Sequence, residues 1–412
     1  MRNLKPTTIL LIFILGVSSQ LYDQTNWTHP SSDPVLGYGE NGTWDAGIVS
    51  RPFLINEGDT CKMWYAGDTY GDLTNSMNVG YAWSLNGITW NRYEKNPVMY
   101  ADLDWEGGRI YSGPIIKDGY IYKMWYTAGA SVGTFIGYAE SVDGIHWQKH
   151  PEPVLKKGPE SDWDGGYVSA TTVIKDGDTY KMWYWGADNQ YIAYAPHQIG
   201  YATSPDGIIW TKYNNPFTLD NFMDSDPVVV NGKVIHGDAQ RVWAPCVIKS
   251  ADKYEMWYTA TNSTLTINDK VCYAISSDGI NWQKYEDNPV LGKFPTWGMG
   301  YSPCSVFWDE YDNAYHMYYS SYVLNDAQDD HQAQIGFAVS RLKLGYSDGV
   351  WTTKKPMPVG KGSIATAVLG DLIYVIGGRM AGGGVPEGVD AYNSVMETWM
   401  PKSKLSIPIN GG

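Results

Sequence analysis

The sequence is poor in cysteine and in charge. Its four cysteines, Cys61, Cys246, Cys272 and Cys304, are spaced too widely for a zinc site or a dense disulfide framework. We expect buried free thiols, with Cys246 and Cys304 on neighbouring strands because each follows a proline at a matching repeat position. Charged residues make up 18% of the chain and the net charge is −14. This balance argues against a nucleic-acid partner, which requires clustered lysines and arginines.

Long apolar runs are also scarce. The run from Ile9 to Val17 follows Arg2 and Lys5 and ends in small residues. It is too short to span a bilayer as a helix. The pattern therefore predicts a secretory signal peptide over residues 1–20 and a secreted, periplasmic or extracellular protein with no transmembrane segment in the mature chain. An uncleaved membrane anchor is the alternative.

What the sequence has in abundance is aromatic residues and tight turns. Residues 105–155 contain four short runs rich in Ile, Val, Tyr and Trp, punctuated by Asp118-Gly119 and Asp143-Gly144. Such runs, bounded by Asp-Gly turns, indicate strands joined in hairpins. Four-stranded units that repeat about every 50 residues are typical of β-propeller blades.

The second strand of this unit recurs five times. Its copies are Lys62–Tyr65, Lys123–Tyr126, Lys181–Tyr184, Glu255–Tyr258 and His316–Tyr319. The Gly-containing turn before the fourth strand recurs only four times, while an unpartnered strand, 27–36, stands near the N-terminus. We therefore predict an all-β, five-bladed propeller over residues 22–345, closed by its N-terminal strand, because closure removes exposed sheet edges.

A different pattern begins after Tyr346. The strand 371–376 ends in Gly377-Gly378, and Tyr392 and Trp399 follow, which resembles a Kelch repeat. A single blade cannot bury both of its faces. We therefore interpret residues 346–412 as one Kelch-like blade of an array that continues beyond this chain, through which a protein partner could bind. A sixth blade inserted in the first ring is the alternative.

The long loops predict which end of the propeller carries a site. Second-to-third-strand loops at residues 67–78, 185–198, 259–269 and 320–334 are long and unlike one another. Binding residues are usually found on such loops. On the same face a carboxylate precedes the innermost strand of four blades: Asp45, Glu106, Asp164 and Asp238. These acids are our candidates for catalysis as an acid/base pair, and a turn-capping structural role is the alternative.

Most of the 19 tryptophans recur at repeat positions and are interpreted as packing. Trp185 and Trp243 break the pattern, so they are candidates for stacking on a sugar ring. The other predicted substrate-binding residues start or precede inner strands: Arg51, Arg109, Tyr111, Tyr167, His236, Arg241 and Tyr301. No cofactor or metal is predicted, and a central calcium ion has no residue pattern to support it.

The blade pattern Met-Trp-Tyr, Gly-Tyr-Ala, Ser-x-Asp-Gly-x-x-Trp and Asn-Pro-Val-Leu resembles the five-bladed propeller glycoside hydrolases. That superfamily includes arabinanases, β-xylosidases, invertases, levansucrases and mannoside phosphorylases. The resemblance implies an oligo- or polysaccharide substrate and catalytic carboxylates on inner strands. This chain departs from it, because the matching places hold Arg51-Pro52, Ala170-Thr171-Thr172 and Ala244-Pro245-Cys246.

Together these features favour a secreted, glycoside hydrolase-like enzyme that uses a carboxylate pair. A non-catalytic carbohydrate-binding propeller and a Kelch-type interaction scaffold are the alternatives, because a fold alone does not decide function. The sequence leaves open the sugar, the linkage, and the choice between hydrolysis and phosphorolysis.

Overall fold

The computed structural model divides the chain into two compact units, Met1–Leu342 and Lys343–Gly412. This division falls close to the boundary predicted after residue 345. The residues that the structure describes are 25–30, 34–69, 77–130, 133–188, 197–215, 225–229, 241–250, 252–261, 269–292, 300–309, 314–324, 331–341, 361–362, 365–369, 372–376, 379–380, 388–393 and 398–404. The predicted signal peptide lies outside them.

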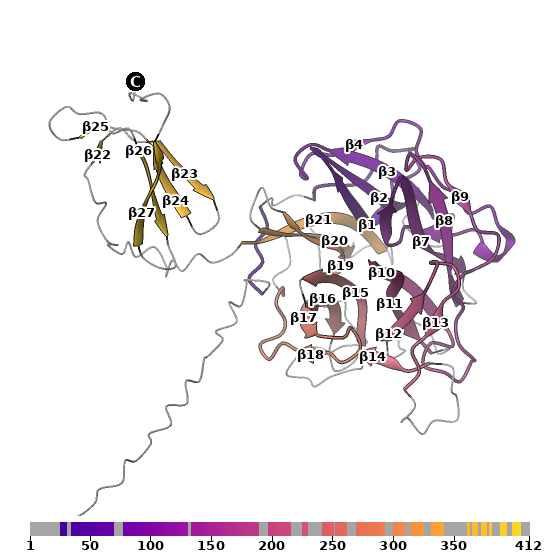
Figure 1. Ribbon diagram of the computed structural model, residues 1–412. Helices are drawn as coiled ribbons and strands as arrows, with labels where there is room; N and C mark the ends of the chain where they lie inside the picture. The colour runs from indigo at the N-terminus through magenta and orange to yellow at the C-terminus, as the bar shows by residue number, and fades with distance from the viewer. Residues whose placement is uncertain are drawn as a thin grey trace, which may run out of the picture. The chain divides into compact units, whose positions relative to one another are not determined.

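The described residues of the first unit form five antiparallel sheets, which Figure 1 shows set around a common centre. The first sheet is β1 (Ile48–Glu57), β2 (Thr60–Asp68), β3 (Asn78–Ser84) and β4 (Asn91–Arg92), and the second is β5 (Ile110–Tyr111), β6 (Ile115–Asp118), β7 (Ile121–Ala130), β8 (Gly133–Ser141) and β9 (Gln148–Lys149). The third is β10 (Tyr167–Asp176), β11 (Thr179–Ala187), β12 (His197–Ser204), β13 (Thr211–Lys212) and β14 (Pro227–Val229). The fourth is β15 (Arg241–Ser250), β16 (Lys253–Thr261), β17 (Lys270–Ser276) and β18 (Gln283–Lys284), and the fifth is β19 (Ser302–Asp309), β20 (Ala314–Leu324) and β21 (His331–Arg341).

The innermost strands contact one another in a closed circuit. β19 lies against β15, β15 against β10, β10 against β6, β6 against β1, and β1 against β19. At the outer edge of the fifth sheet, Thr28 and Leu36 form antiparallel bridges with Val339 and Ile335 of β21. The N-terminal segment of the unit therefore pairs with its last strand.

A hydrogen bond from a buried tryptophan links each of the first three sheets to the next one. The indole Nε1 of Trp64 donates to the carbonyl of Gly144 at 2.7 Å, Trp125 donates to Gly207 at 2.7 Å, and Trp183 donates to Gly279 at 2.9 Å. All three indoles are fully buried. We call each of these contacts a tryptophan latch.

The turn that receives the latch explains the Ser-x-Asp-Gly motif. Ser141 Oγ accepts the N–H of Gly144, and the Asp143 carboxylate accepts the N–H groups of Ile145 and His146. Gly144 has φ 78°, and a Cβ there would lie 2.6 Å from the Trp64 ring. Only glycine meets both the left-handed backbone and the close approach of the indole.

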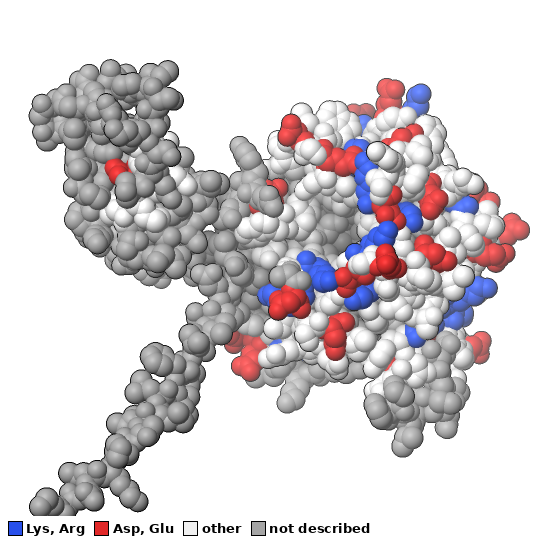
Figure 2. Space-filling view, in the orientation of Figure 1, with Lys and Arg blue, Asp and Glu red and all other residues white. Residues whose placement is uncertain are grey.

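Ion pairs join the first four sheets at the turns between their first and second strands. Asp118 accepts hydrogen bonds from Lys175 at 2.8 Å and from Tyr180 at 2.6 Å, both in the next sheet. The hydrogen bond from Lys175 is the main reason that the pKa of Asp118 lies well below its usual range. Glu57 and Asp176 make the equivalent contacts with their own neighbours. Figure 2 shows basic and acidic side chains interspersed over this view of the first unit.

The second unit contains a separate four-stranded sheet. Its strands are β23 (Ala365–Leu369), β24 (Leu372–Ile376), β26 (Gly388–Asn393) and β27 (Thr398–Lys404), and β22 (Lys361–Gly362) pairs with β25 (Arg379–Met380). Tyr392 and Trp399 face each other across β26 and β27, with ring centroids 5.1 Å apart. The described part of the second unit is thus antiparallel β-structure, and its assignment as a Kelch repeat stays a prediction.

The prediction of buried free thiols holds for Cys246, Cys272 and Cys304, whereas Cys61 is only half-buried. All four thiols are free, three of them are buried, and Cys246 and Cys304 lie on the contacting strands β15 and β19. Over the described ranges the one helix is the single 3-10 turn η1 (Asp104–Glu106), and no helix there is long and apolar enough to cross a membrane.

The tryptophan latch predicts a stability change. Trp125→Phe removes the donor and leaves the Gly207 carbonyl buried without it, so we expect the free energy of unfolding to fall by about 1–3 kcal/mol. Trp83→Phe is the control, because Trp83 is 38% exposed. Denaturant unfolding measures both; an equal, small effect of the two substitutions would contradict the latch.

The ion pair of Asp118 predicts a pH dependence. Its lowered pKa contributes stability that is present above the ordinary aspartate value of 3.8 and is lost as pH falls toward the folded value. Asp118→Asn should therefore reduce stability at neutral pH and flatten the decline below pH 3.8. Asp178→Asn, in an exposed turn of the third sheet, should change neither. Thermal unfolding across pH tests this, and parallel curves for wild type and Asp118→Asn would refute it.

Candidate functional site

The inner strands are interrupted at one common level around the centre. The interruptions fall between Ser50 and Phe53 in β1, Ala170 and Thr172 in β10, Trp243 and Cys246 in β15, and Pro303 and Ser305 in β19, and between β5 and β6 in the second sheet. β-Bulges re-aim side chains and are common next to active sites. Each interruption holds one to three residues that the pairing leaves out, and none of these residues is an acid.

Two of the bulges are strained. Arg51 has φ 50° and Ala244 has φ 46°, and they are the non-glycine residues with positive φ over the ranges that the structure describes. Such residues cost on the order of 1–3 kcal/mol each and cluster at functional sites. The Arg51 backbone is held from two other sheets, because its N–H donates to Ser320 Oγ at 2.7 Å and its carbonyl accepts from Ser112 Oγ at 2.5 Å.

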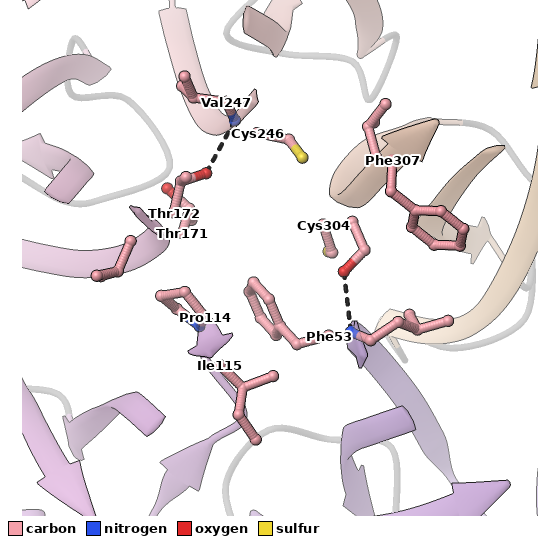
Figure 3. A pocket seen from close by; sticks show the side chains of 13 residues that line it. Phe53, Pro114, Ile115, Thr171, Thr172, Cys246, Val247, Cys304 and Phe307 are labelled. Atoms are coloured by element: carbon pink, nitrogen blue, oxygen red, sulfur yellow. Dashed lines mark hydrogen bonds between the residues drawn. The ribbon is translucent and has the colours of Figure 1, made fainter. Parts of the chain in front are cut away.

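Two adjoining cavities lie between the inner strands at the centre of the first unit, and together we call them the central channel. The first, of about 20 Å³, lies at the level of the bulges between Arg51, Trp243 and Ser302. The second, of about 140 Å³, lies further along the strands and has no charged side chain among its lining residues. Figure 3 shows Phe53, Cys246 and Phe307 around the second cavity, whose wall includes a hydrogen bond from the Val247 N–H to Thr172 Oγ1 at 3.0 Å.

An aromatic wall stands beside the first cavity. The rings of Trp185 and His197 lie 4.9 Å apart, and Trp243 meets Trp185 edge-on at 6.1 Å. Tyr167 packs against the same cluster. Trp185 is only 6% exposed, so of the two predicted tryptophans it is Trp243, which is half-buried, that has ring surface for a ligand.

Arg51 is the one charged residue that lines the central channel over the described ranges. Its guanidinium carbon lies 4.4 Å from the centroid of the Tyr111 ring, and Nη1 donates to Ser169 Oγ at 3.0 Å. Ser169 is in turn hydrogen-bonded to Thr127 at 2.9 Å. The structure therefore brings together Arg51, Tyr111 and the tryptophan cluster, all of which we singled out from the sequence.

The predicted catalytic acids lie elsewhere. Asp45, Glu106 and Asp164 are buried, and each is bound within its own sheet by a tyrosine of the second strand and a basic residue of the fourth. Their partners are Tyr65 and Arg92 for Asp45, Tyr126 and Lys149 for Glu106, and Tyr184 and Lys212 for Asp164. Because each acid is neutralised inside a separate sheet and lines neither cavity, these contacts support the structural alternative.

Other predicted residues are also apart from the channel. Tyr301 is fully buried, stacked on His29 at 5.9 Å and edge-on to Tyr319 at 4.9 Å, so it belongs to the core of the fifth sheet. Arg109 directly precedes β5, the first strand of the second sheet, and lines neither cavity. Asp238 and His236 lie outside the described residues.

The sequence reasoning did not single out Asp269. This residue directly precedes β17, and burial of its carboxyl group raises its pKa to about 6, while the charge of Arg241 acts in the opposite direction. A carboxyl group with such a pKa is suited to general acid catalysis near neutral pH. The available signal in the sequence was its position at the end of the long loop 259–269.

No metal site is found in the part of the chain that the structure describes, where no three His, Cys, Asp or Glu side chains are grouped closely enough.

No family model matches the chain. An uncharacterised Mycobacterium tuberculosis protein, Rv1502, is 28% identical over 236 residues, which cover 55% of this chain and 72% of the relative. A β-1,2-mannobiose phosphorylase of Thermoanaerobacter sp. is 25% identical over 141 residues, covering 32% and 42%. A solved structure described with the GH130 mannoside phosphorylases and β-1,2-mannosidic glycoside hydrolases superposes with a TM-score of 0.58 at 17% identity, covering 81% of this chain and 97% of that one. The chain thus has a propeller-like fold of the kind found in glycoside hydrolases.

The buried acids predict an effect on stability rather than on ligand binding. Glu106→Gln leaves Lys149 without its fully buried counterion, so we expect a loss of about 3 kcal/mol in the free energy of unfolding and unchanged glycan affinity of the folded fraction. Asp102→Asn is the matched control, because Asp102 contacts the same lysine but is 67% exposed. A stable Glu106→Gln protein with lost activity would restore the catalytic assignment.

Proposed function

We propose that this chain is a carbohydrate-active protein that acts on glycosidic bonds, with β-mannosides as the first substrates to test. The observation that carries the proposal is the central channel, in which strained bulges place Arg51 and Trp243 at the centre of a fold shared with glycoside hydrolases. The names of its phosphorylase relatives supply the choice of mannosides.

We also propose that the five sheets of the first unit are the blades of a five-bladed propeller. The contact circuit of the inner strands and the bridges of Thr28 and Leu36 to β21 support closure by the N-terminal segment. Secretion and a Kelch-like role of residues 346–412 complete the proposal, supported by the sequence patterns alone.

For the chemistry, we propose Asp269 as the general acid because of its raised pKa and its place directly before β17, although its side chain lines neither cavity. Hydrolysis of a glycosidic bond needs a second carboxyl group as base or nucleophile. Phosphorolysis needs one acid only, because phosphate itself attacks the sugar. Asp238, outside the described residues, keeps its predicted place as the other candidate acid, and Asp45, Glu106 and Asp164 are assigned to the scaffold.

Carbohydrate binding without cleavage is the second candidate function. It is favoured by one observation: over the described residues, no carboxylate lines the central channel. In that case the aromatic and arginine side chains would hold a glycan that the protein leaves intact.

A cleavage panel with and without inorganic phosphate tests the proposal. We expect wild type to release sugar or sugar phosphate from β-linked mannooligosaccharides, with a rate that falls as pH rises through about 6, because the acid form of Asp269 is lost. Asp269→Asn should lower the rate by about 100-fold or more and abolish that pH limb.

Asp252→Asn, an exposed change in the same sheet, is the control and should retain wild-type rates. Binding of the mannooligosaccharides without any product, at every phosphate concentration, would contradict cleavage and support the second candidate function, carbohydrate binding. Full activity of Asp269→Asn would remove Asp269 from the mechanism.

A further inference from the structure

Arg51 carries a positive charge that no described residue balances. Its contacts are the hydroxyl groups of Ser320, Ser112 and Ser169 and the face of Tyr111. A guanidinium has five N–H donors, and here only one donates to a described side chain. A half-buried charge without a counterion is costly, so the site is suited to an anion that arrives with a ligand.

The guanidinium is also held in place before a ligand binds. Ser169 fixes one nitrogen, Tyr111 supports the plane of the group, and the backbone of Arg51 is locked in a left-handed bulge by residues of other sheets. Preorganisation of this kind reduces the ordering cost of binding. An arginine that only filled space would not need such support.

The dimensions of the site limit what reaches Arg51. The cavity beside it measures about 20 Å³, which admits a small group and not a sugar ring. The ring of the ligand must then lie outside the cavity, toward the strand starts, with the half-buried Trp243 at the boundary. What enters is a substituent of the ring.

We propose that the central channel selects glycans that carry a carboxylate, as in a uronic acid, and that Arg51 binds this carboxylate. This inference rests on the proposed function and names its substrate class. A planar carboxylate with a single negative charge matches one guanidinium in shape and in charge. Phosphate carries more charge at neutral pH and would require further cations, which the described lining of the channel does not supply.

Binding measurements with matched ligands test the inference. Isothermal titration compares a mannuronate trimer with the neutral mannotriose of the same linkage, and inorganic phosphate is titrated alone. We expect wild type to bind the acidic trimer about 10- to 100-fold more tightly than the neutral one, as a charge-assisted hydrogen bond provides. Arg51→Gln should remove this preference, and the preference should weaken with added salt.

Two further variants sharpen the result. Arg51→Lys keeps the charge and loses the planar fork, so we expect an intermediate preference. Lys95→Gln removes one positive charge at an exposed position and should bind like wild type. Thermal unfolding without ligand verifies that each variant is folded. Ser169→Ala keeps the guanidinium but removes its hydrogen bond to Ser169, so it is a milder second perturbation of the preference for the acidic trimer.

Several outcomes would overturn the inference. These are equal affinity of wild type for both trimers, a preference that survives in Arg51→Gln, or Arg51-dependent binding of phosphate but not of mannuronate. Cleavage of neutral mannosides that Arg51→Gln leaves unchanged would uphold the proposed function and refute this inference. Arg51-dependent binding of mannuronate without any cleavage would uphold this inference and refute the proposed cleavage of glycosidic bonds. No binding of any glycan would refute both the inference and the proposed function.

Discussion

The tryptophan latch is the contact on which the rest of the first unit depends. One indole hydrogen bond crosses from each of three sheets to the turn of the next, and the indole itself fills the interface. The latch sets the spacing between sheets, and this spacing determines how closely the inner strands approach the centre. The width of the central channel, and hence the size of the group that reaches Arg51, therefore depends on the packing of tryptophans between the sheets, away from the channel.

The strands could be predicted from the sequence because their signals are local. Asp-Gly turns and alternating aromatic runs are properties of a few adjacent residues, and Met-Trp-Tyr marks the same strand in each of the first four sheets. The partners of Glu106 could not be read in this way, because Tyr126 and Lys149, which donate hydrogen bonds to its carboxylate, lie 20 and 43 residues further along the chain. A repeated acid looks the same in a sequence whether it faces a substrate or a lysine.

The centre was harder to predict for a different reason. Side chains in the channel depend on bulges, and a bulge arises from register between strands rather than from composition. Arg51 was noticed in the sequence because it departs from the pattern of the resembling hydrolases. Its left-handed backbone could not be predicted, because the serine hydroxyl groups that hold it belong to other sheets. Asp269 was missed because its raised pKa comes from burial, which no local motif encodes.

The pairing of Thr28 with Val339 joins residues 311 positions apart. The fifth sheet is completed only when a strand made at the beginning of synthesis meets one made near the end of the unit. The outer edge of β21 therefore gains its partner only when residues from both ends of the first unit are present, so this contact forms only after residue 339 has been synthesised.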